Sequence, residues 1–132
     1  MNKMASSIQE IVNFKVAHGY SNKPNNFVQV MSLHDYHNLW ITWLAILGTK
    51  NNIICFEDQG LVLIPSTFSG KIIGEPKLIP INQILGVEFK RRISTTLIHF
   101  SGENTGIDFV ASNFTAVIPW QKSNLLHLGG NK

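Results

Sequence analysis

The sequence has one cysteine, few charged residues and no long apolar run, and each shortage excludes a class of protein. Cys55 is the only cysteine among 132 residues, so no intramolecular disulfide can form and nothing indicates an oxidising compartment. Its place in the apolar run 53–56 predicts a buried small hydrophobe, because a reactive thiol needs an exposed, electropositive setting. Charged residues make up 14% and hydrophobic residues 44% of the chain, a balance that argues against disorder.

No segment is apolar enough to cross a membrane as a helix. The longest apolar stretch, Leu39 to Leu47, is interrupted by Thr42 and falls far short of the roughly 20 residues that a spanning helix needs. Residues 1–7 lack the apolar core of a signal peptide. We therefore expect residues 1–132 to form a single soluble, cytoplasmic domain.

The order of patterns predicts a mainly β (α+β) fold. Ser7 and Glu10 have capping-box spacing, and apolar residues from Ile8 to Val16 then recur at helical intervals, so we expect a helix over 7–18. Strands are expected over 27–111, with the clearest, 84–92, burying Leu85, Val87 and Phe89 on one face. Short turns then predict an antiparallel meander, and a closing helix over 119–128 must dock on the sheet, being too short to be stable alone.

Three strings carry a resemblance to a known family. Residues 53–61, 79–84 and 119–125 contain an F-x-x-x-G-L hairpin, an I-P-I-x-x-I strand entry and a W-Q-K-x-N-L closing helix. These resemble small uncharacterised Gram-positive bacterial proteins with a pleckstrin-homology-like (PH-like) domain, over about residues 27–128. The resemblance implies an antiparallel β-barrel or bent sheet closed by the C-terminal helix, with the N-terminal helix as an addition. It implies an interaction module and leaves the ligand open.

The candidate ligand-binding residues are the basic cluster Lys90, Arg91 and Arg92. Arginine and lysine at a hairpin mouth can receive phosphate groups, although charges at a strand end also commonly stay in water. The net charge is +3, and three clustered charges are a small footprint compared with the basic stripe of a nucleic-acid-binding protein. We therefore expect no nucleic acid as partner, and keep an anionic ligand or a membrane headgroup as an alternative.

The candidate interaction surface is the apolar segment that contains Trp40, Trp43 and Leu44. Its sequence suits a strand or a buried helix equally well. It is more apolar than a half-exposed strand should be, so it is either covered within the fold or a contact with another subunit. Trp120 and most phenylalanines, by contrast, are expected to fill the core.

A histidine cluster gives the one hypothesis of metal chemistry. His34, Asp35 and His37 are suitable ligands, but zinc needs three or four oriented ligands, and His18, His99 and His127 are scattered along the chain. The sequence has no glycine-rich phosphate loop and no G-x-S-x-G motif, so we expect neither an enzyme nor a cofactor nor a metal. The favoured interpretation is a non-catalytic module that binds a protein or peptide or self-associates. The alternatives are anion binding at 90–92 and a metal-dependent enzyme at 34–37.

Overall fold

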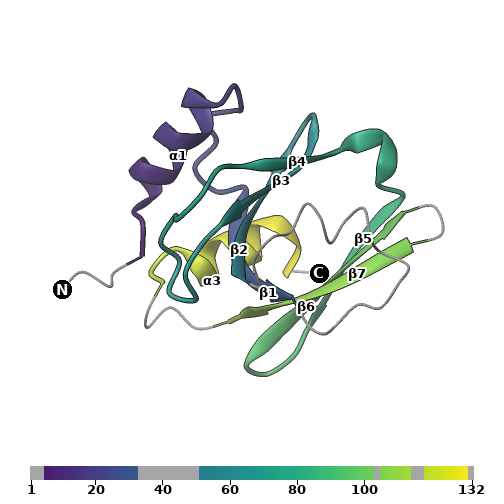
Figure 1. Cartoon of the computed structure of the whole chain (residues 1–132). Coiled ribbons are helices and arrows are strands. Elements are labelled where there is room, and N and C mark those ends of the chain that lie inside the picture. Colours follow the sequence, from purple (N-terminus) through teal and green to yellow (C-terminus); the bar gives the residue numbers. More distant parts are fainter. Residues whose placement is uncertain (1–4, 33–50, 103–104, 114–117, 131–132) are drawn as a thin grey trace.

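The computed structural model describes residues 5–32, 51–102, 105–113 and 118–130. They form one antiparallel sheet, with one helix before the strands in the sequence and one helix after them (Figure 1). The strands follow the order β4-β3-β2-β1-β7-β6-β5. The predicted mainly β class and the two helices are confirmed. The sheet is not closed into a barrel, because β4 and β5 stand at its two edges. The elements are α1 (Ile8–Ala17), β1 (Phe27–Ser32), β2 (Asn51–Glu57), β3 (Gly60–Pro65), β4 (Lys77–Pro80), η1 (Ile81–Gln83), β5 (Gly86–Arg91), β6 (Thr95–Gly102), β7 (Thr105–Ser112), α3 (Gln121–Leu125) and η2 (Leu126–Gly130).

Helix α1 begins at the predicted capping box. Glu10 N donates to Ser7 Oγ (3.1 Å) and Ser7 N donates to Glu10 Oε1 (2.7 Å), so two of the four free amides at the start of the helix are satisfied. The predicted apolar stripe is only partly buried. Ile11 is fully buried, whereas Ile8 and Val16 are exposed, and the buried position one turn after Ile11 is Lys15.

The β2–β3 hairpin forms where the sequence predicted it. Gly60 has a φ of +144° and lies so close to β4 that a Cβ would stand 2.0 Å from the carbonyl oxygen of Ile79. Only glycine fits that position. Strands β5, β6 and β7 then form the expected antiparallel meander.

Strands β1, β2 and β3 are buried on both faces, which explains their continuous apolar sequence. On the inner face, core residues from both halves of the bent sheet meet Leu125 of α3. On the outer face, a second core lies beneath α1 and the segment leading into α3, and Trp120 packs edge-on against Phe27 there. The predicted burial of Cys55 and Trp120 is confirmed.

Helix α3 is fixed to β1 by side-chain amides. Strand β1 pairs with β7 only at Met31 and Ser32, so its earlier residues lack a strand partner on that side. Gln121 takes that place: Gln29 N donates to Gln121 Oε1 (2.9 Å), and Gln121 Nε2 donates to Gln29 O (2.8 Å). Asn124 Nδ2 donates to the carbonyl of Phe27 in the same way (2.9 Å). The closing helix thus completes the edge of β1 where the sheet divides.

Candidate functional site

A groove runs along strand β5. It has a volume of about 640 Å³ and lies between β5 and the η2 turn, lined by Val87, Glu88, Phe89, Lys90, Arg91, Leu128 and Gly129. Within the described residues β5 pairs only with β6, so its other edge is open. The groove therefore follows an edge of β5 that no other described strand pairs with.

The floor of the groove is Phe89, which connects it to the inner core. Phe89 is half-buried, and its ring centroid lies 5.9 Å from that of Phe56, which in turn lies 5.9 Å from Phe100. Gly129 lets η2 approach this ring closely, because a Cβ there would stand 2.9 Å from Phe89 Cδ1. The Phe89 ring is thus held by packing against Phe56 on one side and by the close approach of Gly129 on the other.

The backbone of β5 presents hydrogen-bonding groups along the groove. Arg92 N donates to the carbonyl of Thr95 (2.8 Å) where the β5–β6 hairpin turns. Antiparallel ladders alternate, so from this turn the amide and carbonyl groups of Lys90 and Glu88 face β6, and those of Val87 and Phe89 face the open edge. A peptide laid in the groove would meet backbone partners as well as the Phe89 ring.

The expectation that β5 buries one face is wrong in part. Leu85 is 71% exposed and precedes the strand, and Val87 is 36% exposed, while only Phe89 reaches the core. These apolar residues alternate as a core strand would. No described element covers them, so they remain at the open edge beside the groove.

The basic residues gather at one end of the groove. Lys90 and Arg91 line it, and Arg91 also lines a small adjoining pocket with Lys122 of α3. Glu88 is the acidic residue among the groove's lining side chains. The three candidate residues Lys90, Arg91 and Arg92 are all exposed. Arg92 lies just beyond β5, in the hairpin turn.

The other predicted site residues are not brought together by the described part of the chain. Trp40, Trp43 and Leu44, with the whole of 39–47, and the histidine cluster of His34, Asp35 and His37 lie outside the described residues. Within the described ranges no group of three or more His, Cys, Asp or Glu side chains could hold a metal. The described histidines occupy separate elements: His18 ends α1, His99 lies on β6 and His127 on η2.

His99 and Asp108 form a close pair on the meander. His99 Nδ1 lies 2.5 Å from Asp108 Oδ1, and the two residues are directly opposite in the β6–β7 register. Ser101, two residues along β6, donates its hydroxyl to the carbonyl of Gly86 (3.4 Å). Opposite polar side chains on neighbouring strands stabilise a sheet, and this pair has that role here.

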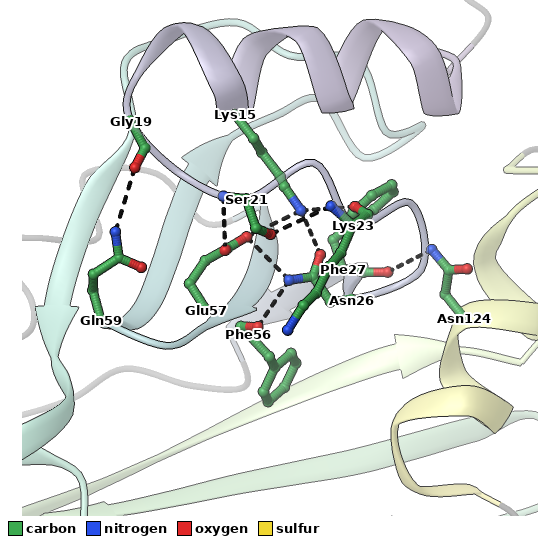
Figure 2. A network of polar contacts seen from close by, with 10 residues as sticks. All are labelled: Lys15, Gly19, Ser21, Lys23, Asn26, Phe27, Phe56, Glu57, Gln59 and Asn124. Carbon is green, nitrogen blue, oxygen red and sulfur yellow. Dashed lines mark hydrogen bonds and ion pairs between the residues drawn. The ribbon is translucent and has the colours of Figure 1, made fainter.

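A buried ion pair that the sequence analysis did not predict lies beneath α1 (Figure 2). Lys15 is fully buried, and its Nζ lies 3.0 Å from Glu57 Oε2. The same ammonium donates to Asn26 Oδ1 (2.5 Å) and to the carbonyl of Lys23 (2.9 Å), which uses all three of its N–H groups. With no group left over for a ligand, the cluster is a structural anchor.

The buried surroundings shift the pKa values of two side chains, Glu57 and Cys55. Burial acts to raise the pKa of Glu57, but hydrogen bonds from Ser21, Asn26 and Lys15 outweigh it and hold that pKa below its usual value. Burial raises the pKa of the Cys55 thiol to about 12, so this cysteine stays protonated and unreactive in the folded protein.

Sequence reasoning missed the two C-terminal residues of the groove. Leu128 was expected only as the last residue of the closing helix, and Gly129 lies just beyond it. Leu128 packs against the inner core and, with Gly129, also lines the groove opposite β5. The one available signal is the pair Gly129-Gly130 after the helix, since glycine marks close approaches as well as helix ends.

Comparisons with protein-family models, curated protein sequences and solved structures found no match to this chain. None of the helices within residues 5–32, 51–102, 105–113 and 118–130 has the length and apolar character needed to span a membrane. The fold and the groove therefore rest on the chain's own geometry.

Proposed function

We propose that this chain is a non-catalytic interaction module, of PH-like type, that binds an extended segment of a partner protein as an added strand along β5. The observation that carries the proposal is the groove of about 640 Å³ beside an open strand edge. Strand addition uses main-chain hydrogen bonds for affinity and pockets beside the strand for specificity. The open edge of β5 supplies the main-chain hydrogen-bonding groups, and the groove floor at Phe89 supplies the pocket.

The arrangement of strands and helix supports the PH-like part of the proposal. Seven antiparallel strands precede a C-terminal helix that packs against the sheet, as the resemblance implies. The proposed location is the cytoplasm, because the buried free thiol of Cys55 needs no oxidising compartment.

The first prediction concerns the backbone of β5. Val87→Pro removes the amide that faces the open edge while sparing the ladder to β6, and proline is tolerated on an edge strand in this orientation. Peptides selected from a random-peptide library on the wild-type protein should bind Val87→Pro about tenfold more weakly, the effect of one lost main-chain hydrogen bond. Isothermal titration calorimetry measures the change.

Two variants serve as controls for this prediction. Val87→Ala keeps the amide and should bind within a factor of about three, and Ile81→Lys changes an exposed apolar residue outside the groove. Equal affinity of Val87→Pro and wild type would rule out strand addition at β5. If light scattering shows a dimer that Val87→Pro separates into monomers, the strand added to β5 is a second copy of the chain.

A further inference from the structure

The tip of the β5–β6 hairpin displays an apolar residue in a basic setting. Ile93 is 97% exposed, the most exposed large hydrophobic residue among those described. Lys90 and Arg92 flank it and are exposed, and Lys122 lies near the base of the hairpin, where it shares a small pocket with Arg91. No Asp or Glu occurs between Phe89 and Gly102. The tip thus combines one fully displayed aliphatic side chain with exposed positive charges.

The backbone carbonyls of the tip have hydrogen-bond partners within the protein. Asn113, the residue that follows β7, donates through its side-chain amide to the carbonyls of Arg92 (2.8 Å), Thr95 (3.1 Å) and Ile93 (3.4 Å). Its backbone amide donates to the carbonyl of Ser94 (2.9 Å). All four tip carbonyls therefore have partners within the protein. Carbonyls that are already paired within the protein lose no hydrogen bond when the tip leaves bulk water.

We propose that this hairpin tip docks the protein on an anionic lipid surface, with Ile93 inserted among the headgroups and Lys90, Arg92 and Lys122 facing lipid phosphates. The charges match an anionic leaflet, where each nearby basic residue strengthens binding about fivefold. The apolar side chain of Ile93 favours a lipid surface over a soluble anion, because only the lipid surface can bury it. In Figure 1 the hairpin tip lies at the bottom of the view, away from α1. Lys90 also lines the peptide groove, but Ile93, Arg92 and Lys122 lie outside it, so the inference goes beyond the proposed function.

The experiment is vesicle sedimentation at physiological ionic strength with the full chain. Wild-type protein should pellet with phosphatidylcholine vesicles that contain about a third phosphatidylserine and stay in solution with phosphatidylcholine alone. Ile93→Ser should weaken binding about tenfold, as expected for losing a buried aliphatic side chain, and Arg92→Gln about fivefold. Because both side chains are exposed, neither change should unfold the protein.

Matched controls come from the β3–β4 connection. Ile73→Ser removes an isoleucine that is 57% exposed, and Lys71→Gln removes one exposed positive charge, both away from the hairpin. These should bind vesicles as the wild type does. Failure of the wild type to pellet, or equal losses in the hairpin and control variants, would overturn the proposal.

A fluorophore tests insertion directly. Ile93→Cys can be labelled with an environment-sensitive dye, because Cys55 is buried with a pKa raised to about 12 and does not compete. Anionic vesicles should shift the emission to the blue, and the same dye on Ile73→Cys should not respond. An unchanged emission spectrum on labelled Ile93→Cys would contradict insertion. Vesicle binding that millimolar inorganic phosphate abolishes, and that Ile93→Ser leaves intact, would indicate an anion site and would also contradict insertion.

Discussion

Lys15 shows how one residue can be charged and buried without being functional. It occupies a core position on α1, and Glu57, Asn26 and a backbone carbonyl take its three protons. Its charge also lies 5.3 Å from the centre of the Phe27 ring, within cation–π range. The ammonium thereby joins α1 to the end of β2 and to the loop before β1.

The ion pair gives a prediction for stability. Lys15→Met leaves the Glu57 carboxylate buried without its counter-charge, so the free energy of unfolding should fall by about 3 kcal/mol. Adding Glu57→Gln to Lys15→Met should recover part of that loss, because the unpaired charge is then gone. Urea unfolding measures both, with Lys23→Ala as an exposed control. Additive losses in the double variant would show that the two residues do not act as a pair.

The lowered pKa of Glu57 predicts how stability depends on pH. The unfolded carboxyl titrates near 4.5 and the folded one below it. Glu57 therefore contributes stability above about pH 4.5, and this contribution is lost as the pH falls through the folded pKa. Unfolding free energy measured across the acid range should decline less steeply in Glu57→Gln than in wild type. Parallel curves would show that other carboxyls carry the acid sensitivity.

At the scale of elements, Gln121 makes two of the three amide hydrogen bonds described above between α3 and β1. Gln121→Leu keeps the volume of the side chain but leaves the amide and carbonyl of Gln29 buried without partners. The free energy of unfolding should fall by about 3 kcal/mol, measured by urea unfolding. Ser123→Ala, on the exposed side of the same helix, should change it by less than about 0.5 kcal/mol. Equal small effects would mean that α3 is held by its apolar contacts alone.

The elements also show where sequence patterns suffice. The capping box at Ser7 and the glycine at position 60 are local signals, and both structures formed where predicted. The burial of Leu85 and Val87 was predicted wrongly, because alternation records which residues are apolar and not whether another element covers them. The groove itself depends on η2 approaching β5 from about forty residues later in the chain, which no local pattern encodes.

The same limit explains the missed polar anchors. Lys15 reads as a charged residue on a helix, and its partner Glu57 lies in a hairpin turn where acids are common for conformational reasons. Gln121 reads as one position of a helical stripe. Each is explained only by a partner distant in sequence, so the fold class could be predicted while the anchors and the groove could not.

The whole molecule is a sheet covered on both sides over its first three strands. The inner core holds the two halves of the bent sheet together, and the outer core holds α1 against β1–β3. The helix α1, which the resemblance treats as an addition, is therefore built into the domain. Ser6, just before it, contributes a carbonyl that accepts a hydrogen bond from Trp120 Nε1 (2.9 Å), while its own amide donates to Gly70 (3.0 Å).

The hydrogen bond between Trp120 and Ser6 joins residues 114 positions apart in the sequence, and the Gln29–Gln121 hydrogen bonds join residues 92 apart. A ribosome makes β1 long before it makes α3, so a nascent chain exposes the bare edge of β1 throughout the synthesis of the remaining strands. Non-local pairings of this kind slow folding, and an uncovered strand edge invites pairing with other chains. The growing polypeptide is therefore most vulnerable to aggregation until residues 118–125 leave the exit tunnel.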